Sequence, residues 1–522
     1  MPAALGAALM LLGAGLVSIS TAFQAAPSSV RVPGNDPGNA SAGIPGDITA
    51  HNSPTVVRNP RNGDELAVAN RIDTPRFSCA LHVSSDGGAT WRQPPIPAPK
   101  GEEPKCYAPD VAYGADGTLY VSFVTLQGTG NEPSAAWLSR STDGGRTLST
   151  PAKILGPLSF QVRLVADPSR PKRLFVTWLA VSEVGLFRFT STGNPVMFKR
   201  SDDGGATWSS GVRVSDAARP RVVAGSLAPG SDGVLHVIYL DLADDRLDHE
   251  GGHEGEGGPP FAGRWKLVLS RSTDGGQTWR ERVVEERLVP TERFVVFIPP
   301  YPSLAVDGRR VYAAFQDGRS GDADVLLWAS EDAGTTFAPP VRVNDTPPGD
   351  GTSQYLPKLA VAPDGRLDVA YYDRRRDPAN TRNEVSLRSS FDQGRTFTRR
   401  VDLAERSFDA RIGFGSERGL PDLGSRLGLS ATDADAVAAW ADTRSGTEAS
   451  NKQDVAVANV TFSSRRRWEP LAWAGMAAVA AGLVVAVSLL LPPERHPRFV
   501  GGGERPEWEG GAVQGRHPGG GG

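Results

Sequence analysis

The chain has 522 residues, of which 39% are apolar and 22% are charged, so it is long and apolar enough to bury a large core. With a formal net charge of -3, the chain lacks the excess of basic residues that nucleic-acid-binding proteins have, so we expect neither DNA nor RNA as a partner. The 60 glycines and 42 prolines suit a turn-rich all-β protein and argue against a helical bundle.

The N-terminal region has two parts. Residues 1–26 contain an apolar run over residues 3–19 followed by small residues, which predicts a signal peptide. An uncleaved N-terminal anchor is the alternative, because no Lys or Arg precedes the run. Residues 27–50 are rich in Pro, Gly and Ser and predict a flexible linker. We therefore expect an exported protein whose folded part starts near His51.

Residues 51–463 repeat a unit that starts with an apolar hairpin. Alternating strands around Asp-Gly or Asn-Gly are the signal of such hairpins, and these dipeptides begin at Asn62, Asp116, Asp232, Asp307 and Asp364. A longer turn over residues 167–172 serves the third unit, and a seventh hairpin over residues 427–440 is followed by one more strand, residues 455–462. The count predicts seven units. The seventh unit lacks its outer strand unless residues 29–32 supply it. The alternative to seven blades is a six-bladed ring with one split unit.

Six units also contain one motif, S-x-D-x-G-x-T-[WF], first seen from Ser84 to Trp91. Ser and Asp can bond nearby backbone groups in a tight turn, Gly permits a positive φ, and the final aromatic residue adds apolar area. Only the second copy departs, since it ends in Leu148. The motifs recur every 57 to 71 residues, a spacing suited to one blade of a β-propeller. Their central aspartates are Asp86, Asp143, Asp203, Asp274, Asp332 and Asp392.

This motif resembles the Asp-box of the sialidase (neuraminidase) or BNR-repeat superfamily, and the resemblance covers roughly residues 51–463. It implies an all-β, seven-bladed β-propeller of four-stranded antiparallel blades, or the six-bladed ring usual for sialidases. It also implies that the Asp-boxes are structural turns on the face away from the active site. Because the superfamily includes hydrolases, receptors and non-catalytic modules, the resemblance alone does not define a function.

Strand parity predicts where a binding site lies. In a four-stranded antiparallel blade, the Asp-box turns share one face, and the segments after the second strands share the other. Those segments repeat a D-x-R pattern at Asp317–Arg319, Asp373–Arg375 and Asp442–Arg444, with less regular counterparts near Arg71 and over residues 241–246. The candidate glycan-contacting residues on this face are Arg71, Arg319, Arg375, Arg444, Asp373, Tyr301 and Tyr355.

The resemblance implies a chemistry that these residue types suit. Sialidases hold a sugar carboxylate with three arginines and use a Tyr nucleophile, a Glu that activates it and an Asp acid/base. The Arg-Ile-Pro motif that introduces the first of these arginines is absent here, and spacing identifies no Tyr–Glu pair, so the catalytic residues are unknown. A repeated D-x-R also fits a blade-stabilising device, in which Asp holds the turn and Arg bridges to a neighbour.

Two functions therefore stay open. One is a sialidase-like propeller that recognises terminal sialic-acid-type linkages and hydrolyses them as an exo-alpha-sialidase. The other is a non-catalytic cell-surface propeller that binds a protein or polysaccharide. The sequence does not decide whether the protein is an enzyme. We expect a glycan or glycoprotein surface as partner, and the sequence does not address the oligomeric state.

Cysteine and histidine patterns complete the list of candidate sites. Cys79 and Cys106 fall on the same face of the ring and predict a disulfide in an exported protein, with two buried thiols as the alternative. The segment His249–His253 matches H-E-x-x-H, but its two glycines and the Gly- and Pro-rich residues 255–260 disfavour the helix that a zinc protease needs. It predicts a solvated acidic loop, and we expect no metal and no cofactor.

The C-terminal region predicts a membrane anchor. Residues 471–491 contain no charge, and a helix of this length covers the roughly 30 Å hydrocarbon core of a bilayer. Residues 464–470 form the juxtamembrane segment, and residues 492–522 predict a disordered tail. The flanking charges do not indicate an orientation, so the N-terminal export signal decides it. The expected location is the cell membrane, with a single span and the propeller outside.

Overall fold

The computed structural model describes residues 49–182, 193–219, 221–245, 261–291, 301–413 and 423–462. The chain divides into two compact units, and these residues all belong to the unit formed by residues 25–464. The described residues form strands and turns without any helix, so this part of the chain holds no helical membrane span. Several predictions concern residues outside the described ranges: the signal peptide, the linker up to residue 48 with its possible outer strand, and everything from residue 464 onward, including the transmembrane helix.

Seven antiparallel sheets, numbered here as blades 1 to 7 in chain order, form a β-propeller. The prediction of seven blades is confirmed. The first strands are β1 (His51–Asn59), β4 (Cys106–Tyr113), β8 (Ser159–Ala166), β12 (Val222–Pro229), β16 (Ser303–Asp307), β20 (Gln354–Val361) and β25 (Gly428–Ala431). The second strands are β2 (Asn62–Ile72), β5 (Leu119–Gln127), β9 (Leu174–Ala180), β13 (Leu235–Asp241), β17 (Arg310–Asp317), β21 (Leu367–Asp373) and β26 (Asp435–Asp442). The third strands are β3 (Ser78–Ser84), β6 (Glu132–Ser141), β10 (Val196–Ser201), β14 (Trp265–Ser272), β18 (Asp324–Ser330), β22 (Arg382–Ser390) and β27 (Asp454–Thr461).

The outer strands vary more than the inner ones. Blades 1 and 7 have three strands among the described residues, and a single bridge between Val83 and Arg92 stands at the fourth position of blade 1. In blade 6 the outer position is shared by two short strands that both pair with β22. The outer strands are β7 (Ala152–Leu155), β11 (Val212–Arg213), β15 (Arg280–Leu288), β19 (Val341–Arg342), β23 (Val401–Asp402) and β24 (Phe408–Asp409).

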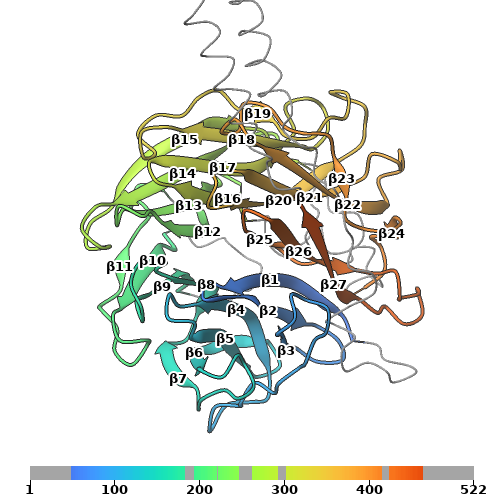
Figure 1. Ribbon diagram of the computed structural model, residues 1–522. Coiled ribbons are helices and arrows are strands. Elements are labelled where there is room, and N and C mark those ends of the chain that lie inside the picture. The colour runs from blue at the N-terminus through green and yellow to red at the C-terminus, as the bar shows by residue number, and fades with distance from the viewer. Residues whose placement is uncertain are drawn as a thin grey trace, which may run out of the picture. The chain divides into compact units, whose positions relative to one another are not determined.

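Apolar side chains hold neighbouring blades together. Seven separate clusters of buried apolar residues each join two consecutive blades, and the seventh joins blade 7 to blade 1. The first strand of each blade also contacts the first strand of the next, so these strands surround a central axis (Figure 1). Burial of both faces of each sheet explains why the inner strands are almost continuously apolar. The ring is thus a circle of seven blade junctions, each with its own core.

Ring closure joins residues that are far apart in the sequence. The bridge between Ala50 and Gln453 brings the start of blade 1 beside the third strand of blade 7. Arg58 adds an ion pair with Asp435 of blade 7, with Nη2 2.8 Å from Oδ2. Gly428 of β25 is held against β1 so closely that a Cβ atom there would lie 2.7 Å from the backbone nitrogen of Val56. Blades 7 and 1 therefore meet directly.

Each Asp-box follows a third strand and forms a compact hydrogen-bonded turn. In blade 3, Ser201 Oγ donates to Asp203 Oδ1 at 2.8 Å and accepts from the Gly205 N–H, also at 2.8 Å. The hydroxyl and N–H of Thr207 donate to the two oxygens of Asp203. These bonds, led by the Thr207 hydroxyl, lower the pKa of Asp203 to about 2, so the turn needs the ionised carboxylate. The same serine and threonine bonds recur around Asp86, Asp143, Asp274, Asp332 and Asp392.

The Asp-boxes also join adjacent blades. Gly276 has a φ of +92° and lies against Phe198 of the preceding blade, where a Cβ atom would come within 2.0 Å of the ring. The corresponding glycines of blades 2, 3, 5 and 6 meet a third-strand side chain of the preceding blade in the same way: Val83, Leu138, Leu269 and Leu327. Glycine therefore provides both the backbone conformation and the space for this junction.

Candidate binding site

The face opposite the Asp-boxes, called the opposite face below, contains the ends of the second strands and the starts of the first strands. The repeated D-x-R pattern lies there, and each copy forms a local ion pair. Arg319 Nε is 2.8 Å from Asp317 Oδ1, and the Arg319 N–H donates to the same oxygen. The equivalent Nε–carboxylate distances are 2.6 Å for Arg375 with Asp373 and 2.7 Å for Arg444 with Asp442. In every copy the aspartate holds both the turn and the arginine.

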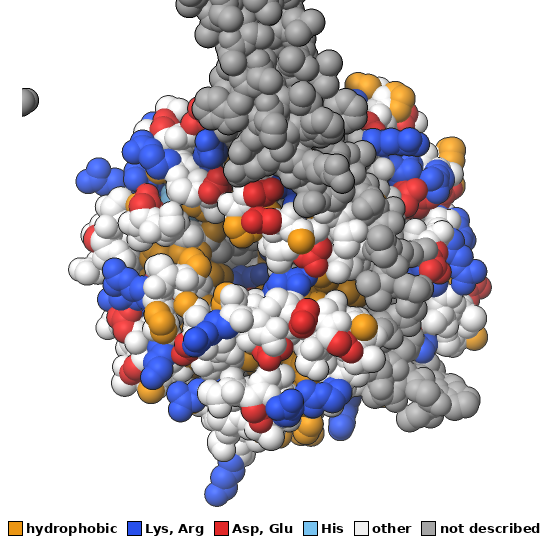
Figure 2. Space-filling model, viewed as in Figure 1, with side chains coloured by type: hydrophobic (Ala, Val, Ile, Leu, Met, Phe, Trp, Pro, Cys, Tyr) orange, Lys and Arg blue, Asp and Glu red, His pale blue; other side chains and the backbone are white. Residues whose placement is uncertain are grey.

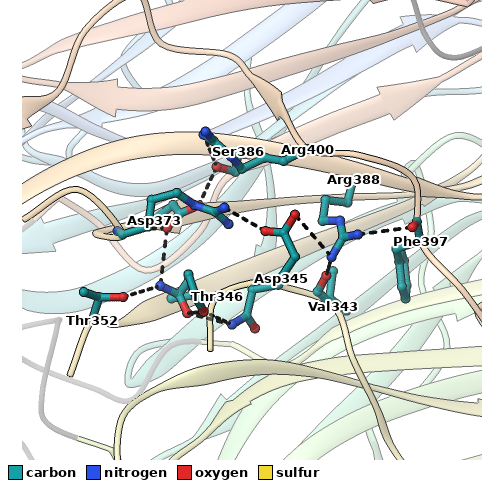
Figure 3. Close-up of polar contacts among 12 residues, drawn as sticks. Val343, Asp345, Thr346, Thr352, Asp373, Ser386, Arg388, Phe397 and Arg400 are labelled. Carbon is teal, nitrogen blue, oxygen red and sulfur yellow. Dashed lines mark hydrogen bonds and ion pairs between the residues drawn. The ribbon is translucent and has the colours of Figure 1, made fainter. Parts of the chain in front are cut away.

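Each of these arginines also reaches the preceding blade. Arg319 pairs with Glu285 of β15 at 2.8 Å, and Arg375 pairs with Asp345, just after β19, at 2.7 Å. Arg444 lies 3.8 Å from Glu405, which follows β23. Figure 3 shows the network between blades 5 and 6, where Asp345 lies near Arg388, and Asp373 accepts a hydrogen bond from Ser386 at 2.7 Å. The D-x-R pattern thus bridges blade junctions.

The remaining predicted residues lie in different surroundings. Arg71 is 5% exposed, pairs with Asp73 at 2.6 Å, and its guanidinium lies 5.2 Å from the centre of the Tyr107 ring in blade 2. Tyr355 belongs to the core between blades 6 and 7, where its hydroxyl accepts a hydrogen bond from Asn383 at 2.8 Å. The structure therefore distributes Arg71, Arg319, Arg375 and Arg444 over four junctions and does not bring them to one point. Tyr301 differs from these residues because it lies near the axis.

A second set of polar residues meets on the axis, and most of these residues were not predicted from the sequence. Five first strands contain a β-bulge near their start, in β1, β4, β8, β12 and β20. A bulge re-aims the side chain that follows it. In β4, β8 and β20 that side chain is Asp110, Arg163 and Lys358, respectively. Residues of blades 2, 3 and 6 can face one another only across the centre of the ring.

The contacts of these residues define what we call the axial cluster. Arg163 Nε lies 3.4 Å from Asp110 Oδ2, which also accepts a hydrogen bond from the Leu164 N–H at 3.0 Å. Arg426 of blade 7 donates from Nε to Thr55 Oγ1 at 2.9 Å and from Nη2 to the carbonyl of Pro109 in blade 2. Lys358 experiences the charges of Arg163, Asp110 and Arg426, and Tyr301 experiences those of Arg426 and Arg163 and interacts with Tyr107. The axial cluster consists of Tyr107, Asp110, Arg163, Tyr301, Lys358 and Arg426.

Burial shifts the titration of the axial cluster. It lowers the pKa of Lys358 to about 8 and that of Arg426 to about 10, and in both cases a neighbouring cation adds to the shift. Burial raises the pKa of Tyr301 to about 12, so its hydroxyl is neutral at physiological pH. Figure 2 shows a hollow near the centre of the molecule with Lys or Arg atoms deep inside it. The axis is therefore a cationic hollow.

Two cysteines lie beside this site. Cys79 of β3 and Cys106 of β4 form a disulfide with a Cα–Cα distance of 5.5 Å, which ties blade 1 to blade 2 next to Tyr107. Within the described ranges, no group of His, Cys, Asp or Glu side chains could hold a metal ion. The segment His249–His253 lies outside those ranges.

The first strands carried a signal that could have indicated the axial cluster. Ala108-Pro109-Asp110 and Leu356-Pro357-Lys358 each interrupt an apolar first strand with proline and a charge, and Ser53-Pro54-Thr55 is a neutral version. Proline inside a strand suggests a bulge or an edge. A charged residue at the same place in two innermost strands points towards the axis.

The fold and site together define a class of protein, an Asp-box β-propeller with a polar hollow on its axis. The chain belongs to the BNR repeat-like domain family, whose model matches residues 164–450.

Similar solved structures include a protein of unknown function from Dyadobacter fermentans, with 16% identity, coverage of 80% of this chain and 100% of that chain, and a TM-score of 0.44. A Hadza microbial sialidase has 14% identity, coverage of 76% and 73%, and a TM-score of 0.40. An alpha-L-arabinofuranosidase from Fusarium graminearum has 13% identity, coverage of 73% and 98%, and a TM-score of 0.42. No curated protein matches the chain.

Proposed function

We propose that this protein is a glycan-recognition propeller that binds its ligand in the axial hollow. The observation that supports this most directly is the meeting of charged and aromatic side chains from blades 2, 3, 5, 6 and 7 on the axis. Concave sites with a few convergent polar groups are the usual form of a ligand site. Aromatic rings and hydrogen-bonding side chains suit the two kinds of surface that a sugar presents.

Recognition without hydrolysis fits the geometry better than sialidase chemistry. The four arginines proposed to hold a sugar carboxylate are each engaged at a separate blade junction. A tyrosine nucleophile is activated by a neighbouring base or by a lowered pKa, whereas burial raises the pKa of Tyr301 to about 12. Hydrolysis is the second candidate function, because Tyr301 and Asp110 lie in one cluster and could act as nucleophile and acid.

We further propose that the propeller is exported and anchored in the cell membrane. The support is the apolar run over residues 3–19 and the uncharged span over residues 471–491. Protease added to intact cells is then expected to degrade the propeller. In cells that are not treated with protease, the protein is expected in the membrane fraction. Protection of the propeller in intact cells would contradict this orientation.

A glycan array probed with the purified full-length chain tests recognition, and fluorogenic sialosides test hydrolysis. We expect saturable binding to a subset of glycans and no release of the fluorophore. Arg163→Met removes an axial side chain and is expected to weaken binding. Arg444→Ala removes an arginine of the D-x-R pattern on the same face and is the matched control, which is expected to bind normally when folded. Absence of binding to any glycan by folded protein would contradict the proposal, and turnover of sialosides would favour the hydrolase.

A further inference from the structure

We infer that the axial hollow contains an oxyanion-binding subsite formed by Lys358 and Arg426, so that the ligand carries a carboxylate, sulfate or phosphate group. This inference rests on the proposed function, because it specifies the chemical class of glycan that the same hollow accepts. It differs from the predicted arrangement of arginines, since neither residue belongs to the D-x-R pattern.

Three other arginines with little exposure have a carboxylate in direct contact. Arg366 pairs with Asp368 at 3.0 Å, Arg71 with Asp73 at 2.6 Å, and Arg375 with Asp373 at 2.6 Å. The exposed fraction of the arginine side chain in these pairs is between 1% and 16%. This pattern follows the general rule that a charge removed from water needs a partner.

The axial cluster departs from this rule. Within the described ranges its carboxylate is Asp110, which is already paired with Arg163. The contacts of Arg426 are a hydroxyl oxygen of Thr55 and a carbonyl oxygen of Pro109, both uncharged. Lys358 has no ion pair with any carboxylate of the described residues. Among the described residues, neither of these two cations has a carboxylate in direct contact, although both feel the charge of Asp110.

This excess of positive charge is costly without a ligand. Arg426 is 7% exposed, and Arg163 acts as a like charge on both Arg426 and Lys358, an effect that Asp110 opposes. Tyr301 cannot supply the missing negative charge at neutral pH, because burial raises its pKa to about 12. An anionic group placed between Lys358 and Arg426 would remove the repulsion and gain two charge-assisted hydrogen bonds.

The geometry favours an oxyanion attached to a larger molecule. Arg426 is held in place by its contacts from blades 1 and 2, so its remaining N–H groups present a fixed donor to the hollow. Lys358 keeps part of its surface accessible and follows a bulge in β20, which aims it at the same space. A fixed guanidinium beside a mobile ammonium accepts planar carboxylates as well as tetrahedral sulfates and phosphates. The rest of the sugar would then extend towards the mouth of the hollow.

Calorimetric titration of the purified full-length chain tests this subsite. The probes are glucose, glucuronic acid, glucose 6-sulfate and glucose 6-phosphate, with inorganic sulfate and inorganic phosphate as further arms. We expect at least one acidic sugar to bind at least about 10-fold more tightly than glucose, because a hydrogen bond to a charged group contributes about 1.5 to 3 kcal/mol. The ranking of the three acidic sugars identifies which oxyanion the site prefers.

Three variants connect the effect to Lys358. Lys358→Met is expected to weaken binding of the preferred acidic sugar by about 10- to 100-fold and to leave binding of glucose unchanged. Lys358→Arg keeps the charge and is expected to retain affinity within a few-fold. Arg319→Met removes a cation of the D-x-R pattern on the same face and is expected to leave the affinity of the folded protein for the acidic sugar unchanged. Folding of each variant is checked by its thermal unfolding transition.

The outcomes separate this inference from the proposed function. Equal affinity for glucose and all acidic sugars, or unchanged affinity in Lys358→Met, would overturn the oxyanion subsite while glycan recognition stood. Binding of inorganic sulfate or phosphate that Lys358→Met abolishes, without binding of any sugar, would support the subsite and overturn glycan recognition.

Discussion

Lys358 makes ligand binding depend on pH at the level of one residue. Its pKa of about 8 means that the ammonium is charged at pH 7 and largely neutral at pH 9.5. Because an oxyanion binds the charged form, we expect full affinity below about pH 7.5 and a decline of up to about 10-fold per pH unit above pH 8. Calorimetric titrations of the best acidic sugar between pH 6 and pH 9.5 measure this dependence.

The substitution Lys358→Arg is the control for this dependence. Arginine stays charged over the whole range, so the affinity of this variant is expected to be constant between pH 6 and pH 9.5. Among the groups that act on Lys358, Arg426 has a pKa of about 10, so it stays mostly charged over this range. An equal decline in both proteins would show that another group causes it.

Residue types alone distinguished structural from ligand-binding charged residues only in part. The sequence placed Asp317, Asp373 and Asp442 before arginines on one face, and it offered both a structural and a ligand-binding interpretation. The D-x-R arginines pair with carboxylates of the preceding blade, which agrees with the structural interpretation. Lys358 and Arg163 were missed because they occupy strands that are otherwise apolar, where a single charge carries no periodic signal. Their partners lie in blades that are not neighbours in the sequence.

Among the structural elements, the Asp-box turn makes the sharpest stability prediction. Gly276→Ala adds a Cβ atom at a φ of +92° and within 2.0 Å of the Phe198 ring. Phe198 is 1% exposed and packs against Trp279 at 5.1 Å, so its ring has little room to move. We expect a loss of about 1 to 2 kcal/mol from the left-handed backbone and a further 1 to 3 kcal/mol, roughly, from overpacking. Chemical denaturation measures the change in free energy of unfolding.

Gly233→Ala is the matched control for Gly276→Ala. Its φ of +81° is similar, but no atom lies within 4 Å of the added Cβ. This variant is therefore expected to lose only the backbone contribution. Equal destabilisation of the two variants would mean that contact with the preceding blade does not matter, and that the glycine serves the turn alone.

The strands themselves were predictable, and their irregularities were not. Asp-Gly and Asn-Gly dipeptides located the hairpins because a two-residue turn fixes its own register. The predicted seventh hairpin over residues 427–440 corresponds to β25 and β26. The bulges in β4, β8 and β20 depend instead on packing around the axis, which no local pattern specifies. The site was therefore harder to predict than the fold that supports it.

For the whole molecule, counting repeats predicted the ring, whereas the way it closes depends on distant residues. Six spaced motifs and a seventh hairpin were enough for seven blades, since each blade needs a neighbour on both sides to bury its apolar faces. The pair of Arg58 and Asp435 spans 377 residues, and sequence spacing contains no information about it. Each junction combines an apolar core with its own polar bridge.

The bridge between blades 6 and 7 gives a prediction for the stability of the ring. Arg366 is 1% exposed, pairs with Asp368, and donates hydrogen bonds to the carbonyl oxygens of Thr432, Asp433 and Asp435 in blade 7. Arg366→Met leaves the Asp368 carboxylate buried without its cation, which is expected to lower the free energy of unfolding by about 3 to 5 kcal/mol. Arg395→Met removes an arginine whose side chain is 62% exposed and paired with Glu331, so a loss of at most about 1 kcal/mol is expected.

A double substitution distinguishes the buried charge from the lost hydrogen bonds. Burial raises the pKa of Asp368, and Arg366 opposes this shift. If the unpaired carboxylate causes most of the loss, Arg366→Met combined with Asp368→Asn is expected to be more stable than Arg366→Met alone. If the hydrogen bonds to blade 7 dominate, the double variant stays as unstable as the single one, and the bridge acts by joining blades rather than by pairing charges. Chemical denaturation of the four proteins of this cycle decides between the two results.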